Sequence, residues 1–126
     1  MTKEKVTLEY DMKSTPVSML WAYISTANGL KEWFADDAQI NGKDVTLIWN
    51  GTSQESTIVG MRFEKYIRFR PKEESDKSYI EMRISSSEMT GNSILTITDF
   101  AEPDDVEEIT DLWNYQVETL QRQLGC

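Results

Sequence analysis

The sequence predicts an α+β fold in which a curved antiparallel sheet of six to seven strands packs against two short helices and one long C-terminal helix. Residues 6–12 alternate apolar and polar side chains, and about six more alternating segments follow in the middle of the chain. Residues 104–125 instead repeat apolar side chains at helical spacing. Short connections between the strands favour antiparallel pairing, and a sheet with one apolar face needs one covering layer. The helices supply that layer.

The long helix is the most clearly marked element. Its apolar positions recur at steps of three and four and form one stripe: Val106, Ile109, Trp113, Val117, Leu120 and Leu124. Pro103 precedes the helix, acidic side chains fill its first turns and Arg122 lies in its last turn, as the helix dipole favours. Burying such a stripe stabilises the fold by on the order of 10 kcal/mol before entropy is counted. The stripe must therefore pack against the sheet.

Two short helices are expected directly after the first strand. Ser14 or Thr15 is a candidate N-cap, and Pro16 suits the first helical position. The first helix is expected to end near Ile24, and Gly29 is expected to bend the second. The pattern then returns to strands, which are expected at 38–40, 45–50, 57–63, 66–70, 79–88 and 94–100.

Composition excludes several classes of function. The chain has 126 residues, enough for a single domain spanning residues 1–126, and no apolar run long enough for a membrane span or a secretory signal. A formal net charge of -9 disfavours nucleic acid and anionic membrane surfaces as partners. There is no histidine, and the one cysteine is Cys126, which argues against zinc sites, histidine-based catalysis and an internal disulfide. We expect a cytoplasmic protein without metal, cofactor or membrane insertion.

Two motifs stand out: Gly29-Leu30-x-x-Trp33-Phe34 in the second helix and Thr98-Asp99-Phe100-Ala101 ahead of the acidic helix. Together with the order strand, two helices, six strands and long helix, they resemble the START-like superfamily, also called SRPBCC or helix-grip. The closest branch is the family similar to the C-terminal domain of the heat-shock ATPase activator. This resemblance covers essentially the whole chain. It implies a helix-grip fold with a ligand cavity between sheet and long helix, and no catalytic residue.

Nine side chains are candidates for lining such a cavity, chosen by strand alternation and by the helix stripe: Trp49, Met61, Phe69, Met82, Ile84, Ile97, Ile109, Trp113 and Val117. A closed apolar core would use the same residues. Their bulk favours a small or narrow apolar ligand over a large one.

Polar candidates are few. Asp99 is in register with Leu95 and Ile97, so it either points inward, where it could orient a ligand or act as a base, or ends the strand and bonds a turn. Asp36 and Asp37 are adjacent and lack the spaced oxygens of a calcium loop.

Residues 62–72 interleave cations with aromatic side chains: Arg62, Lys65, Arg68, Arg70 and Lys72 with Phe63, Tyr66 and Phe69. The pattern is similar to a nucleic-acid-binding strand pair. The preferred interpretation is the outer face of two neighbouring strands whose cations pair with glutamates, and the alternative is a surface for an acidic protein partner.

Three functions remain open from sequence. The first is a domain that binds a small hydrophobic molecule between sheet and helix. The second is a protein-interaction module of co-chaperone type without a ligand, using the acidic helix face or residues 62–72. The third is a cyclase-like or hydrolase-like enzyme using carboxylates or tyrosines. The serines Ser85 to Ser87 have no histidine or lysine partner nearby in the sequence, so nucleophilic catalysis has no support.

Overall fold

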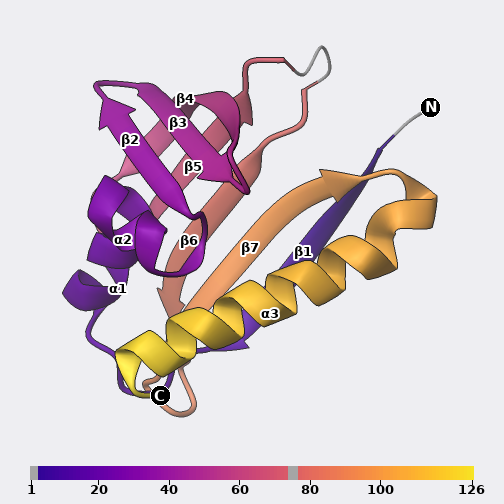
Figure 1. Cartoon of the computed structure of the whole chain (residues 1–126). Coiled ribbons are helices and arrows are strands. Elements are labelled where there is room, and N and C mark those ends of the chain that lie inside the picture. Colours follow the sequence, from indigo (N-terminus) through magenta and orange to yellow (C-terminus); the bar gives the residue numbers. More distant parts are fainter. Residues whose placement is uncertain (1–2, 74–76) are drawn as a thin grey trace.

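One curved antiparallel sheet with helices on its concave side makes up the protein (Figure 1). The computed structural model describes residues 3–73 and 77–126. The elements are β1 (Glu4–Asp11), α1 (Val17–Ser25), α2 (Ala27–Trp33), β2 (Asp37–Asn41), β3 (Asp44–Trp49), β4 (Thr52–Arg62), β5 (Tyr66–Pro71), β6 (Ile80–Ser86), β7 (Ser93–Ala101), the 3-10 turn η1 (Pro103–Asp105) and α3 (Val106–Leu124). The strand order is β1-β7-β6-β5-β4-β3-β2, with every neighbouring pair antiparallel. The predicted α+β fold is confirmed.

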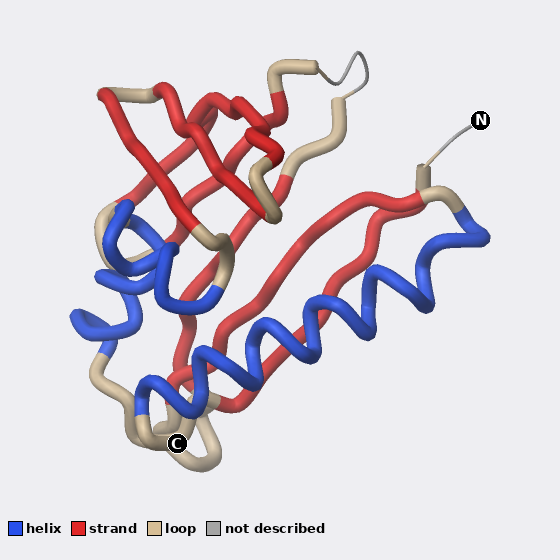
Figure 2. Tube along the Cα trace, viewed as in Figure 1, coloured by secondary structure: helices blue, strands red, loops and turns tan. Residues whose placement is uncertain are grey.

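The long helix α3 runs along β1 and β7, and the β2–β3 end of the sheet curls round to face it (Figure 2). Trp113, Val117 and Leu120 are buried at the middle of its predicted stripe, whereas Ile109 and Leu124 near its ends are half-buried. The chain leaves α3 through Gly125, whose left-handed backbone lets its N–H reach the carbonyls of the last turn. The helix therefore covers one side of the concave face, and α1 and α2 cover much of the rest.

The details of α1 and α2 differ from the prediction. Pro16 itself is the N-cap of α1, and the Thr15 hydroxyl donates instead to the carbonyl of Met12 over 2.7 Å. The helix α2 is continuous through Gly29, and the Thr26 hydroxyl caps it by accepting from the Gly29 N–H at 2.9 Å. A Cβ at Gly29 would lie 2.1 Å from the carbonyl oxygen of Ala22 in α1. This glycine is thus required for the close packing of α2 on α1, a role that the sequence pattern did not indicate.

The inner face of β4 does not follow a single alternation along the strand. Ile58 is buried, whereas Val59 and Met61 are 43% and 55% exposed. The pairing of β4 with β5 is irregular between Ile58 and Gly60, where one extra residue reverses the phase of the alternation. Ile58 therefore faces inward before the insertion, and Met61, opposite the buried Ile67, shares the inner face after it. Simple alternation cannot register such an insertion. Met61 is exposed because it lies one residue before the end of β4, outside the covered part of the sheet.

The convex face carries a network of charged and aromatic side chains. Arg68 Nη2 and Arg83 Nε donate to the two carboxylate oxygens of Glu81 over 2.7 and 3.2 Å. The Arg68 guanidinium lies 4.1 Å from the ring centroid of Tyr79, and that of Arg83 lies 4.5 Å from that of Tyr66. Two cations thus share one nearly buried carboxylate and cover two aromatic rings.

Replacing Glu81 by glutamine is expected to lower the free energy of unfolding by about 1–2 kcal/mol at pH 7. Burial would raise the pKa of Glu81, but the hydrogen bonds from Arg68 and Arg83 outweigh it and hold the pKa below its ordinary value. The stabilisation is therefore present above the ordinary pKa and is lost as the pH falls through the lower folded-state pKa. Urea denaturation at several pH values measures this loss. Glu9→Gln is the control on an exposed site, and equal losses in both variants would contradict the prediction.

Candidate functional site

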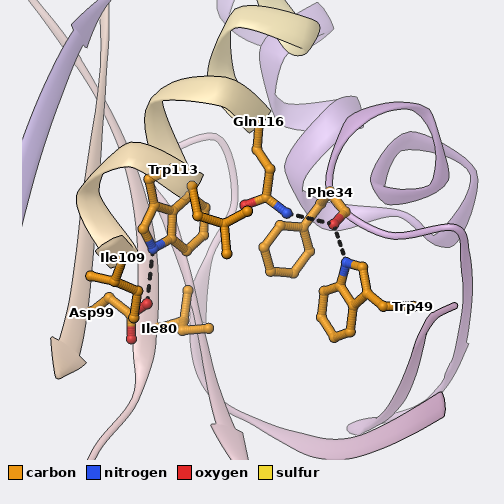
Figure 3. Close-up of a pocket in the computed structure, with 8 residues that line it drawn as sticks. Phe34, Trp49, Ile80, Asp99, Ile109, Trp113 and Gln116 are labelled. Atoms are coloured by element: carbon orange, nitrogen blue, oxygen red, sulfur yellow. Dashed lines mark hydrogen bonds between the residues drawn. The ribbon is translucent and has the colours of Figure 1, made fainter. Parts of the chain in front are cut away.

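A groove of about 380 Å³ opens between α3 and the concave face of the sheet (Figure 3). Its eight lining residues come from the end of α2, three strands and α3: Phe34, Trp49, Ile80, Asp99, Ile109, Leu112, Trp113 and Gln116. All but Asp99 and Gln116 are apolar. Two hollows extend the groove, one toward α2 past Phe34 and one toward η1 past Asp99. The volume lies within the range of sites that bind small molecules.

The aromatic side chains of the groove are held by specific contacts. The Phe34 ring is stacked on Trp113, with ring centroids 5.4 Å apart, and meets Trp49 edge-on at the same distance. The Phe34 carbonyl accepts hydrogen bonds from Trp49 Nε1 at 2.7 Å and from Gln116 Nε2 at 3.0 Å. Both bonds are visible in Figure 3. One backbone carbonyl after α2 therefore joins β3 and α3 at the wall of the groove.

Asp99 is the carboxylate in the main part of the groove. It lies in β7 opposite Val6, and its Oδ2 accepts from Trp113 Nε1 over 2.8 Å while its Oδ1 accepts from the Phe100 N–H over 2.7 Å. Burial raises the pKa of Asp99, although these two hydrogen bonds and the charge of Lys3 partly offset the shift. The side chain points into the groove, and its backbone bond is to the next residue of β7, which continues to Ala101, so Asp99 neither ends the strand nor bonds a turn. The two hydrogen bonds and Lys3 therefore compensate only part of the cost of burying the Asp99 carboxylate.

The structure brings three of the nine predicted lining residues, Trp49, Ile109 and Trp113, together in the groove. Five others are buried in the closed core: Phe69, Met82, Ile84, Ile97 and Val117. Met61 is more than half exposed on β4, away from the groove. Alternation indicates which face of a strand turns inward, but it does not show which positions lie under a helix and which face a gap.

Sequence reasoning did not select Phe34, Ile80, Leu112 and Gln116. A signal existed for three of them. Ile80 continues the alternation of β6, and Leu112 and Gln116 border the apolar stripe of α3. Phe34 belongs to the motif of residues 29–34, but neither the stacking of its ring on Trp113 nor the two bonds to its carbonyl follow from a side-chain pattern.

The remaining polar candidates have structural partners. Asp36 Oδ2 accepts from the Asn50 N–H over 2.7 Å, and Asp37 Oδ1 lies 3.6 Å from Lys31 Nζ. Within the described residues there is no cluster of three or more acidic or cysteine side chains that could hold a metal. In the basic segment 62–72, Lys72 pairs with Asp44 over 2.9 Å in addition to the pairing of Arg68 described above. The described helices include none with the length and apolar character needed to cross a membrane.

The architecture is that of the helix-grip proteins, in which an antiparallel sheet curls around a long C-terminal helix. A model of the START-like superfamily domain matches residues 1–126, and the chain belongs to that superfamily. No curated protein matches it significantly.

Solved structures show the same relationship. BfR322 from Bacteroides fragilis is 39% identical, with 98% of this chain and 92% of that chain covered and a TM-score of 0.69. The Aha1 dimer from Colwellia psychrerythraea is 14% identical, with 96% of each chain covered and a TM-score of 0.79. Protein BH1534 from Bacillus halodurans is 19% identical, with 98% of this chain and 99% of that chain covered and a TM-score of 0.75. The last two share the fold alone.

Proposed function

We propose that this protein binds a small, largely hydrophobic molecule in the groove between α3 and the sheet. The observation that carries the proposal is the groove itself, an open space of about 380 Å³ whose lining is mainly apolar. Exposed apolar surface in a groove gains roughly 25 cal/mol for each Å² that a ligand removes from water.

The groove is suited to a ligand because its walls are set before binding. The stacked pair Phe34 and Trp113 and the hydrogen bond from Trp49 to the Phe34 carbonyl leave little side-chain motion to be lost when a ligand enters. Leu112 is 53% exposed beside them, on the side of α3 that faces the groove. A flat apolar molecule could cover Leu112 and the edge of Trp49 together.

Replacing Leu112 by glutamate is expected to weaken ligand binding by tenfold or more, because a ligand would have to bury an unpaired carboxylate at a cost of roughly 2 kcal/mol or more. The probe is N-phenyl-1-naphthylamine, an uncharged fluorophore whose emission rises in an apolar site. Fluorescence titration measures its affinity. Leu112 is largely exposed, so the fold should tolerate the change.

Gln123→Glu is the matched control, since it adds the same charge to an exposed position of α3 outside the groove. Its affinity for the probe should equal that of the wild type. If wild-type protein does not bind the probe, or if both variants bind it equally well, the groove is not the binding site.

A further inference from the structure

One end of the groove carries negative charge. Asp99 lines both the main groove and the hollow that continues it toward η1, where Glu102 and Asp105 also contribute to the lining. Further carboxylates lie along η1 and the first turns of α3: Asp104, Glu107, Glu108 and Asp111. Lys3 is the one cation among the described residues that line this hollow. The local field therefore favours a cation over an anion.

The carboxylates at this end retain unused hydrogen-bond capacity. A carboxylate offers about four lone-pair sites, and Asp99 uses two of them, for Trp113 Nε1 and for the Phe100 N–H. Glu102 Oε2 is buried and has no hydrogen-bond partner in the described part of the chain. Buried acceptors normally have partners, so two acceptors in one hollow are open to a donor.

We propose that the ligand is a hydrophobic amine, whose apolar body lies against Phe34, Trp49 and Trp113 and whose ammonium group donates to Asp99. The inference rests on the proposed function and specifies the chemical class of its ligand. A protonated amine brings three N–H donors and one positive charge, which match the open acceptors and the acidic end of the groove. The aromatic faces nearby add cation–π attraction.

Burial explains why a cation is preferred to a neutral donor. Burial raises the pKa of Asp99, so its ionised form is poorly solvated where it stands, and the Trp113 and Phe100 donors and the charge of Lys3 offset this only in part. An ammonium group would supply the missing compensation. A carboxylate ligand, such as a fatty acid, would bring a like charge to the same place.

Three probes of nearly equal size separate charge from apolar contact: 2-phenylethylamine, 2-phenylethanol and phenylacetate. Titration calorimetry near 0.15 M salt, where distant charges are screened beyond about 8 Å, measures their affinities. Wild type should bind the amine tightest and phenylacetate weakest, with about a tenfold gap between them. Asp99→Asn should weaken amine binding about tenfold and leave the affinity for phenylethanol nearly unchanged.

Asp111→Asn is the matched control, because it removes the same charge from an exposed position of α3 that does not line the groove. If it weakens amine binding as much as Asp99→Asn, the preference is a general field effect and the contact with Asp99 is refuted. Equal affinities of wild type for all three probes would overturn the amine proposal and leave the hydrophobic groove standing. Failure of every probe to bind would overturn both. If Asp99→Asn does not fold, the order of the three affinities measured on the wild type still tests the amine proposal.

Discussion

Replacing Gly29 by alanine is expected to destabilise the protein by about 3 kcal/mol or more, since overpacking a closed contact typically costs 1–3 kcal/mol and backbone resists displacement. The new Cβ would lie 2.1 Å from the Ala22 carbonyl oxygen and 2.5 Å from the Tyr23 Cα, both backbone atoms of α1. Accommodating it requires α1 and α2 to separate. That movement would disturb Leu20, Ile24 and Leu30, which are fully buried between these helices and the sheet.

Urea denaturation followed by circular dichroism measures the effect of Gly29→Ala. The matched control is Asn28→Ala, one residue earlier in the same helix, where the side chain is exposed and the change should fall within about 0.5 kcal/mol of zero. At an exposed helix position, replacing glycine by alanine would instead stabilise the protein by roughly 1 kcal/mol, because alanine has the higher helix propensity. A Gly29→Ala variant as stable as wild type would show that α1 and α2 do not approach this closely.

Trp113→Ala is expected to destabilise the protein by about 4 kcal/mol, the usual range for removing a buried tryptophan being 3–5 kcal/mol. Trp113 is 2% exposed and lies at the centre of an aromatic cluster, stacked on Phe34 and 6.4 Å from Trp33 between ring centroids. Its removal also leaves the Asp99 carboxylate with the Phe100 N–H but without the indole donor. Both losses weaken the attachment of α3 to the sheet.

Two further variants separate these contributions. Tyr115→Ala, an exposed aromatic on the same helix, should change stability by about 0.5 kcal/mol or less. Trp113→Phe keeps most of the packing and removes the N–H donor, so it should cost about 1–2 kcal/mol, between the other two. Chemical denaturation of all three variants tests this order. A Trp113→Ala loss no larger than that of Tyr115→Ala would mean that the helix is not anchored through this side chain.

The sequence predicts the fold well because its elements are defined by local patterns. The stripe of α3 and the alternation of β6 and β7 each repeat often enough to outweigh local exceptions, and buried Val117 and Ile97 lie where those periods put them. Prediction fails where one extra residue reverses the inward and outward alternation of a strand, as in β4 between Ile58 and Gly60. It also fails at Gly29, whose role depends on a helix that packs across it.

The candidate site is less predictable. Trp49, Ile109 and Trp113 were expected in a cavity, but so were five residues that the core encloses. Whether an inward residue faces packing or open space depends on how far the curled sheet stands from α3 at that point, and this distance is absent from any periodicity.

The sequence alone determines the order of strands and helices, the apolar face of α3 and the lack of histidine chemistry, because these depend on residue type and spacing along the chain. Only the tertiary structure decides that the Phe34 carbonyl joins β3 to α3 and that Asp99 meets Trp113 in a mainly apolar groove. These contacts unite residues 14 to 82 positions apart. Their geometry arises from the twist of the sheet and the packing of α3 across it, which no single segment encodes.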